Sequence, residues 1–120
     1  MTKKIYYLST CSTCKRIMKE LNIDDSFEQQ DIKFTPLTED QMLFLKEKTG
    51  SYESLFSKRS RQYRALGLHE QNLSEEDYKK YILQEYTFLK RPVIIIGDQV
   101  FVGNSKKVIA EVEKCLRGGE

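Results

Sequence analysis

Two of the three cysteines in this chain of 120 residues, Cys11 and Cys14, form a C-x-x-C pair in the stretch YLSTCSTCKRIM. Such a pair supports thiol-disulfide exchange or half of a zinc site, or it packs as two inert apolar side chains. Zinc sites usually have four ligands, and besides this pair the chain offers only His69 and Cys115. Two inert buried thiols are the stronger alternative, but the position of the pair directly after a predicted strand and at the start of a predicted helix, with a cis-proline candidate downstream, favours redox or anion chemistry. We expect no metal, a structural Cys115 and a His69 on the surface.

The residues on either side of the pair predict a strand followed by a helix. Residues 4–8 are rich in Ile, Tyr and Leu, which favours a strand. Ser12 and Thr13 are good N-cap residues, and apolar residues recur at helical spacing from Cys14 onward. Cys11 is therefore predicted just outside the helix, and Cys14 in its first turn.

A thiol at the start of a helix faces free backbone N–H groups and the positive end of the helix dipole, and both stabilise a thiolate. This setting lowers the pKa of a cysteine. Cys11 is the residue placed to benefit, and the neighbouring Lys15 and Arg16 add positive charge. Cys14 lies one helical turn further on, close enough to attack a bond formed at Cys11. We therefore expect Cys11 to be the catalytic nucleophile and Cys14 the resolving thiol.

The rest of the chain predicts further strands and helices around this pair. A polar strand is predicted at 27–32, and a helix from the capping box Thr38-Glu39-Asp40-Gln41 to about Lys48. Shorter helical stretches follow, including one that begins at Ser74. Two apolar runs around Gly97-Asp98 predict a hairpin, and Ser105 begins a last helix.

Composition limits the function classes. The chain is 39% hydrophobic and 32% charged with a net charge of +2, so no bulk field favours nucleic acid or a membrane. Its longest strongly apolar run, at residues 93–96, is too short to span a bilayer, and the first residues lack a signal-peptide pattern. We expect a cytoplasmic protein, in which thiols are kept reduced.

The predicted order is β-α-β, a block of helices, and then β-β-α. This order fits an α/β thioredoxin-like fold with a mixed sheet and a helical insertion between its halves. We expect one domain over 1–120, with its core at about 1–35 and 88–117 and the insertion at about 36–87. Thioredoxin-like folds have a cis-proline that faces the active cysteine, and Pro92 stands in that place.

Three segments of this chain, STCSTCKR, SKRSRQYRALGL and FLKRPVIIIGDQVFVGNSKKV, resemble the ArsC/Spx family of thioredoxin-fold proteins in their order and spacing. The most specific part is the Arg91-Pro92 pair before a strand and a G-x-x-x-F-V-G hairpin. The resemblance covers nearly the whole chain. The family contains glutaredoxin-coupled arsenate reductases and Spx-type transcriptional regulators.

The resemblance to the reductases implies a thiol-dependent oxidoreductase that acts on a small oxyanion or a disulfide, with Cys11 at the position of their catalytic cysteine. It implies no bound cofactor, with glutathione, glutaredoxin or thioredoxin as reductant. In the reductases, backbone amides of the turn and three arginines hold the oxyanion. The corresponding residues here are Ser12 and Thr13 for the turn, Arg91, either Ser57 or Arg59, and Asn104 in place of the third arginine.

The second cysteine resembles instead the C-x-x-C redox switch of Spx-type regulators. These regulators bind the C-terminal domain of the RNA polymerase α-subunit, and Gly50 lies near the glycine that they use. The resemblance therefore implies a second hypothesis, a redox-sensing regulator with that polymerase domain as its partner. Neither hypothesis includes direct binding of nucleic acid or of a membrane.

Overall fold

The computed structural model describes residues 2–119 and confirms the predicted α/β fold, a four-stranded mixed sheet with a helical insertion. The chain divides into two compact units. The first comprises the chain up to Thr35 together with the part from Arg91 onward, and the second is Pro36–Lys90. Within the described residues, no helix is both long enough and apolar enough to cross a membrane.

The sheet of the first unit has the strand order β2-β1-β3-β4. Strand β1 is parallel to β2 and antiparallel to β3, and β3 is antiparallel to β4. The predicted hairpin is present, and Gly97 at its turn has a φ of 61°, a left-handed conformation that glycine adopts without strain. The strands are β1 (Lys3–Tyr7), β2 (Glu28–Asp31), β3 (Val93–Ile96) and β4 (Gln99–Val102).

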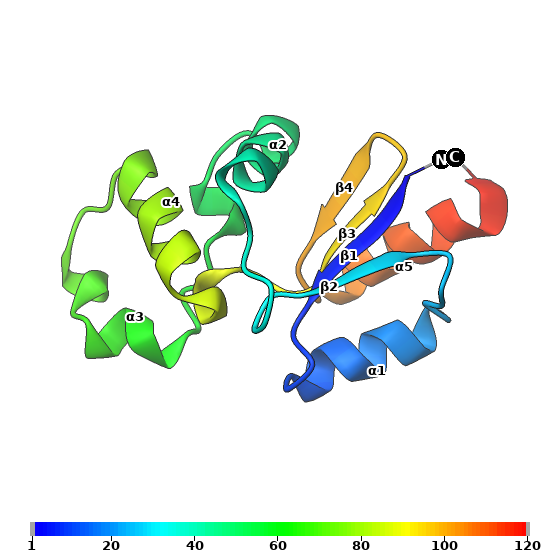
Figure 1. Ribbon diagram of the computed structural model, residues 1–120, viewed down its shortest axis with the longest axis horizontal. Coiled ribbons are helices and arrows are strands. Elements are labelled where there is room, and N and C mark those ends of the chain that lie inside the picture. The colour runs from blue at the N-terminus through cyan, green and yellow to red at the C-terminus, as the bar shows by residue number, and fades with distance from the viewer. Residues whose placement is uncertain (1, 120) are drawn as a thin grey trace. The chain divides into compact units, whose positions relative to one another are not determined.

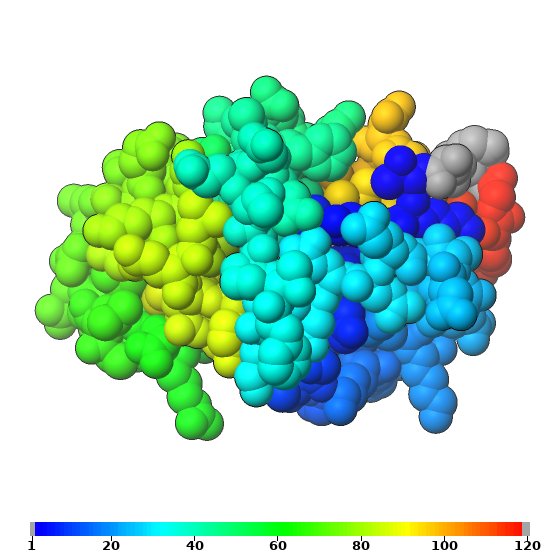
Figure 2. All heavy atoms as spheres, viewed as in Figure 1, coloured from blue at the N-terminus to red at the C-terminus, as the bar shows by residue number. Residues whose placement is uncertain are grey.

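Helices α1 (Ser12–Glu20) and α5 (Lys106–Lys114) lie against the same face of this sheet (Figure 1). Helix α5 continues into a wider turn, Cys115–Gly119. Figure 2 shows the cyan residues around β2 in front of part of the dark blue start of the chain, in keeping with the inner place of β1 in the sheet. The core cluster joins strands and helices and consists of Ile5, Ile17, Leu21, Phe27, Ile94, Ile96 and Val112.

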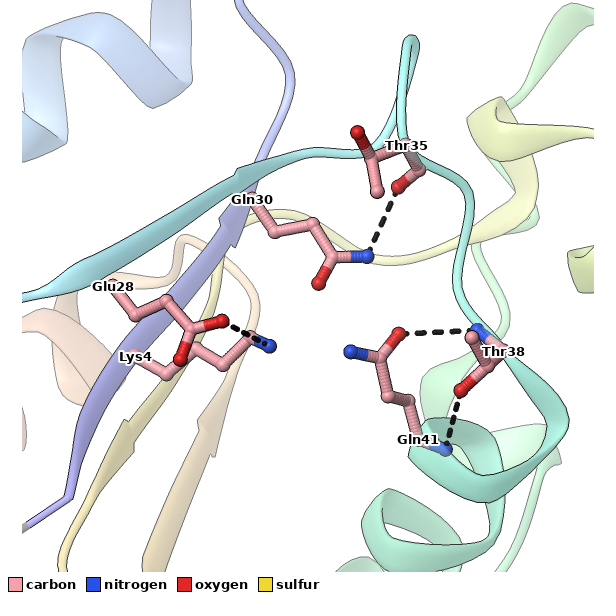
Figure 3. A network of polar contacts seen from close by, with 6 residues as sticks. All are labelled: Lys4, Glu28, Gln30, Thr35, Thr38 and Gln41. Carbon is pink, nitrogen blue, oxygen red and sulfur yellow. Dashed lines mark hydrogen bonds and ion pairs between the residues drawn. The ribbon is translucent and has the colours of Figure 1, made fainter.

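The second strand is shorter and more polar than a core strand. The sequence predicts it over 27–32, but it spans only Glu28–Asp31, because the N–H of Phe27 donates to the carbonyl of Asp24 in a turn. A second turn begins at Asp31, whose carbonyl accepts from Thr35. Strand β2 forms one edge of the sheet, where Lys4 and Glu28 make an ion pair of 3.0 Å (Figure 3).

The second unit is helical and is built around stacked aromatic side chains. Phe56 stacks on Phe88 at a centroid distance of 4.9 Å and meets Tyr78 edge-on at 4.9 Å. The first helix of the second unit begins with the predicted capping box of Thr38 and Gln41 (Figure 3). Its α-helices are α2 (Glu39–Thr49), α3 (Arg61–Ala65) and α4 (Glu75–Gln84), and its short 3₁₀ turns are η1 (Glu53–Leu55), η2 (Leu68–Glu70) and η3 (Tyr86–Phe88).

Candidate functional site

Four loops of the first unit lie at one end of the sheet, and they carry four of the predicted site residues, Cys11, Arg91, Pro92 and Asn104. Strands β1 and β2 are parallel with Tyr7 opposite Asp31, so both end there. Strand β3 runs the other way with Val93 opposite Tyr6, so the Arg91–Pro92 segment enters there. The N–H of Gly103, after β4, donates to the carbonyl of Pro92 at 2.9 Å. The sheet therefore brings together the loops at 8–11, 32–35, 91–92 and 103–105.

Cys11 stands at the junction between the first loop and helix α1. Its N–H donates to the carbonyl of Leu8 at 2.9 Å, and its own carbonyl accepts the first helical bond, from Lys15. The structure confirms Cys11 just outside the helix and Cys14 in its first turn.

The expected N-cap is corrected, because Cys11 is the N-cap residue and Ser12 already belongs to the helix. The tight turn from Leu8 to Cys11 brings the chain round early, so helical geometry begins one residue sooner than the polar residues suggested. No side-chain hydrogen bond of ordinary geometry caps α1. The N–H groups at its start are therefore directed toward the Cys11 side chain and the space beyond it.

The two thiols differ sharply in exposure. Cys14 is fully buried with 0% of its surface exposed, whereas Cys11 is partly exposed. Both are free thiols. Cys11 is therefore the thiol of the pair that solvent can reach.

Burial raises the pKa of Cys11, but three contacts outweigh it and leave the pKa below its ordinary value. In order of size they are the backbone N–H of Cys14, the side chain of Cys14, and the guanidinium of Arg91, which acts through a hydrogen bond and through its charge. Lys15 and Arg16, the cations expected to act on Cys11, are exposed. The main favourable charge comes instead from Arg91.

The pKa of Cys14 shifts in the opposite direction. Burial is the main cause, and the pKa of Cys14 is raised to about 11. The backbone of Leu8 opposes this rise, as Arg91 does to a smaller extent, whereas the charge of Cys11 and the hydrogen bond to Cys11 add to it. At neutral pH Cys14 is therefore a thiol whose S–H donates to the sulfur of Cys11. The pair thus has one thiol that loses its proton more readily than an ordinary cysteine and one that keeps its proton, a division that suits one attacking and one resolving cysteine.

Arg91 reaches Cys11 because β3 lies beside β1. The peptide bond between Arg91 and Pro92 is cis, as the sequence predicts. Pro92 is buried and Arg91 is partly buried. With Tyr6 opposite Val93, the residues just before Val93 lie beside the residues that follow β1, where the loop to Cys11 begins. The sheet register thus sets Arg91 beside the sulfur of Cys11.

The other predicted anion-binding residues are in different places, and their roles stay predictions. Ser12 and Thr13 begin α1, where the first amides have no helical acceptor. Asn104 is exposed and follows Gly103, whose N–H donates to the carbonyl of Pro92 at the end of the sheet where β3 begins. Arg59 is exposed in the second unit, just before α3, and the alternative Ser57 donates its N–H to Phe88 at 2.6 Å.

The remaining candidate ligands do not form a metal site. His69 lies in η2, 3.6 Å from the carboxylate of Glu70, and Cys115 packs against the core cluster of the first unit. Across residues 2–119, no group of three or more His, Cys, Asp or Glu side chains could hold a metal ion.

Sequence reasoning missed Asp31. Its Oδ1 accepts a hydrogen bond from the N–H of Ser9, two residues before Cys11, at 3.4 Å. Nothing in its local sequence distinguishes Asp31 from the chain's other acidic residues. The signal that could have found it is topological, because parallel neighbouring strands end at the same edge and place the residues after them side by side.

Known proteins resemble this chain along almost all of its length. The model of the ArsC family matches residues 6–112. The chain is 25% identical over 119 residues to the global transcriptional regulator Spx of Streptococcus mutans, covering 97% of this chain and 87% of the regulator.

Two solved structures show the same fold. A putative arsenate reductase from Yersinia pestis has a TM-score of 0.74 at 17% identity, with 91% of this chain and 98% of that one covered. The arsenate reductase from Vibrio cholerae has a TM-score of 0.72 at 19% identity, with 93% and 98% covered.

We predict that Arg91→Met raises the pKa of Cys11, because it removes the cation and the donor that favour the thiolate. Below the pKa the alkylation rate follows the thiolate fraction, so at mildly acidic pH the rate at Cys11 should fall about tenfold. Iodoacetamide labelling against pH, read by peptide mass spectrometry, measures this rate. Arg16→Met, which removes an exposed cation from α1, should leave the profile unchanged. Equal profiles for wild type and Arg91→Met would contradict the assignment.

Proposed function

The chain belongs to the ArsC family, and we propose that it is a thiol-dependent oxidoreductase in which Cys11 attacks the substrate and Cys14 resolves the product. The observation that carries this proposal is the opposite tuning of the two thiols. Cys11 is accessible with a lowered pKa, and Cys14 is buried with a raised one. Two inert core thiols would both be buried, and neither would be paired with an arginine.

The first proposed step is attack by the Cys11 thiolate on a small oxyanion or a disulfide. With a disulfide, the sulfur of Cys11 bonds to one substrate sulfur, the S–S bond breaks, and the other sulfur leaves as a thiolate that takes a proton from water. With an arsenate-like oxyanion, the sulfur replaces one oxygen, which leaves as water after protonation.

The second step is attack by Cys14 on the sulfur of Cys11. It forms the Cys11–Cys14 disulfide and leaves two electrons with the substrate, either as a released thiolate or as reduced arsenite. Once Cys11 carries the substrate it no longer has a negative charge, so one cause of the raised pKa of Cys14 disappears. Cys14 therefore loses its proton more easily after the first step than before it. Two thiols, from glutathione or from glutaredoxin or thioredoxin, then reduce the disulfide.

The anion would be held beside Cys11 by groups at the end of the sheet where β1 ends and β3 begins. The first amides of α1, at Ser12 and Thr13, suit an anion at a helix start. The guanidinium of Arg91 offers a planar pair of donors. We propose Asn104 as an uncharged donor, and the resemblance to the reductases implies Arg59 of the second unit as a further cation. With two cations instead of three arginines, anion binding should be weaker.

A second candidate function is that of a redox-switch regulator. It is favoured by the 25% identity to the Spx regulator over 97% of this chain, and by the C-x-x-C pair itself. In this alternative the same pair senses oxidants, and the protein binds the C-terminal domain of the RNA polymerase α-subunit. Gly50, the left-handed C-cap of α2 with a φ of 98°, lies near the position that Spx-type proteins use.

The oxidoreductase proposal predicts turnover with a glutathione mixed disulfide or arsenate when glutathione with glutaredoxin, or thioredoxin with its reductase, is supplied. Cys11→Ser should abolish turnover, because no nucleophile remains. Cys14→Ser should accumulate protein that carries one glutathionyl group on Cys11, which intact-mass spectrometry detects. Cys115→Ser, which changes the third thiol outside the pair, should leave the rate within about twofold of wild type.

The contrary result separates the two functions. The first observation would be the absence of turnover with either reductant. The second would be binding of the purified polymerase α domain with an affinity that changes when Cys11 and Cys14 are oxidised, measured by calorimetry on the reduced and the oxidised protein. Together these results would overturn the oxidoreductase and establish the switch.

The anion site gives a separate prediction. Sulfate should bind the reduced protein at millimolar concentration, and Arg91→Lys should weaken binding about tenfold because a lysine ammonium lacks the planar fork. Arg59→Ala should weaken binding by a smaller factor. Arg64→Ala, which removes another exposed arginine of the second unit, should leave sulfate binding unchanged. The absence of sulfate binding in wild type, or equal affinity in Arg91→Lys, would contradict an oxyanion role.

A further inference from the structure

The turn that carries Cys11 has little to hold it in shape by itself. Between β1 and α1, its internal backbone bond joins the N–H of Cys11 to the carbonyl of Leu8. The helix that follows has no side-chain cap other than the contact of the Cys11 sulfur itself with the N–H of Cys14. The position of the Cys11 sulfur relative to the Cys14 N–H and Arg91 nevertheless decides its reactivity. A restraint from outside the turn is therefore expected.

Asp31 supplies a restraint from the neighbouring strand. It is the last residue of β2 and lies opposite Tyr7, the last residue of β1. Its Oδ1 accepts from the N–H of Ser9 at 3.4 Å and from the N–H of Lys33 at 3.2 Å. One carboxylate oxygen thus ties the start of the Cys11 turn to the turn that follows β2.

The turn that presents Asp31 is itself well fixed. The carbonyl of Asp31 accepts from the N–H of Phe34 at 3.2 Å and from that of Thr35 at 2.9 Å. The side chain of Gln30 donates to the carbonyl of Thr35 at 3.0 Å (Figure 3). Beside it, the N–H of Ile32 donates to the carbonyl of Tyr7 at 2.9 Å. These bonds already hold the carboxylate in place, so its hydrogen bond to Ser9 requires little further loss of conformational entropy.

Asp31 is charged at neutral pH. Burial raises its pKa, but the hydroxyl and N–H of Ser9 and the N–H and charge of Lys33 outweigh this effect and leave the pKa below its ordinary value. A charged acceptor makes stronger hydrogen bonds than a neutral one. Both polar groups of Ser9, the hydroxyl and the amide, thus favour the same partner.

We propose that Asp31 is a positioning residue that holds the Leu8–Cys11 turn in the shape that aims the Cys11 sulfur at the start of α1 and at Arg91. It acts through Ser9.

A rival role for Asp31, in which it acts only as a nearby negative charge, makes the opposite prediction. Loss of the charge favours a thiolate, whereas loss of the restraint lets the sulfur leave its stabilising contacts. The catalytic importance of Asp31 rests on the proposed function, but its effect on Cys11 is measurable without any substrate.

The test is the pH profile of iodoacetamide labelling at Cys11 in the reduced full-length protein. In Asp31→Ala the rate at mildly acidic pH should fall about threefold, because the thiolate is less favoured. In Asp31→Asn the side-chain oxygen still accepts from Ser9, so the fall should be smaller or absent. Asp24→Ala is the matched control. It removes the same charge and another side-chain bond to an N–H, that of Ser26 at 2.9 Å, and should leave the profile unchanged.

A faster or unchanged rate in Asp31→Ala would overturn the proposal, the faster rate identifying Asp31 as a charge alone. Circular dichroism establishes whether each variant is folded. If Asp31→Ala does not fold, Ser9→Ala takes its place, since it removes the hydroxyl from Asp31 and leaves the charge. A slower rate in Ser9→Ala then supports the proposal, and an unchanged or faster one overturns it. The labelling rate does not depend on turnover, so failure of the oxidoreductase assay and failure of this proposal are distinguishable.

Discussion

The contact between the sulfur of Cys11 and the guanidinium of Arg91 is the interaction on which the rest of the site depends. The two residues are eighty positions apart, and they meet because β1 and β3 are neighbours with Tyr6 opposite Val93. The cis-proline follows Arg91 directly, at the entry to β3. A shift of one residue in this register would turn the alternating side chains of β3 to the opposite faces of the sheet. The packing of the core and the contact between Cys11 and Arg91 therefore both require the same register between β1 and β3.

That contact also explains why two chemically identical thiols behave differently. Cys14 belongs to the buried face of α1, so its charged form is costly, and it remains a donor to Cys11. Cys11 stands at the surface end of the same helix and receives the N–H of Cys14 and the charge of Arg91. Cys14 thus lowers the pKa of Cys11, and Cys11 raises the pKa of Cys14. Position on one helical turn, together with one arginine, is sufficient for this division.

The sequence predicted the fold and the elements that carry the cysteine pair, but it could not identify every partner of Cys11. Strong local signals, such as the capping box at Thr38 and the hairpin at Gly97-Asp98, are present as expected because their physics is local. Arg16 was expected to act on Cys11 as its neighbour in sequence, but Arg91 does so across the sheet. Asp31 was missed for the same reason, since its contact with Ser9 exists only after β1 and β2 pair. The first residue of α1 depended on the tight turn after β1, which residue propensities do not report.

The central claim is that Cys11 loses its proton more readily than an ordinary cysteine whereas Cys14 keeps its own, and NMR titration of the two cysteine Cβ signals in the reduced protein tests it most directly. The account predicts that the Cβ of Cys11 titrates first, below the pKa of an ordinary cysteine, and that the Cβ of Cys14 moves only in strongly alkaline solution. Titration of Cys14 before Cys11, or of both at the ordinary cysteine pKa, would contradict it.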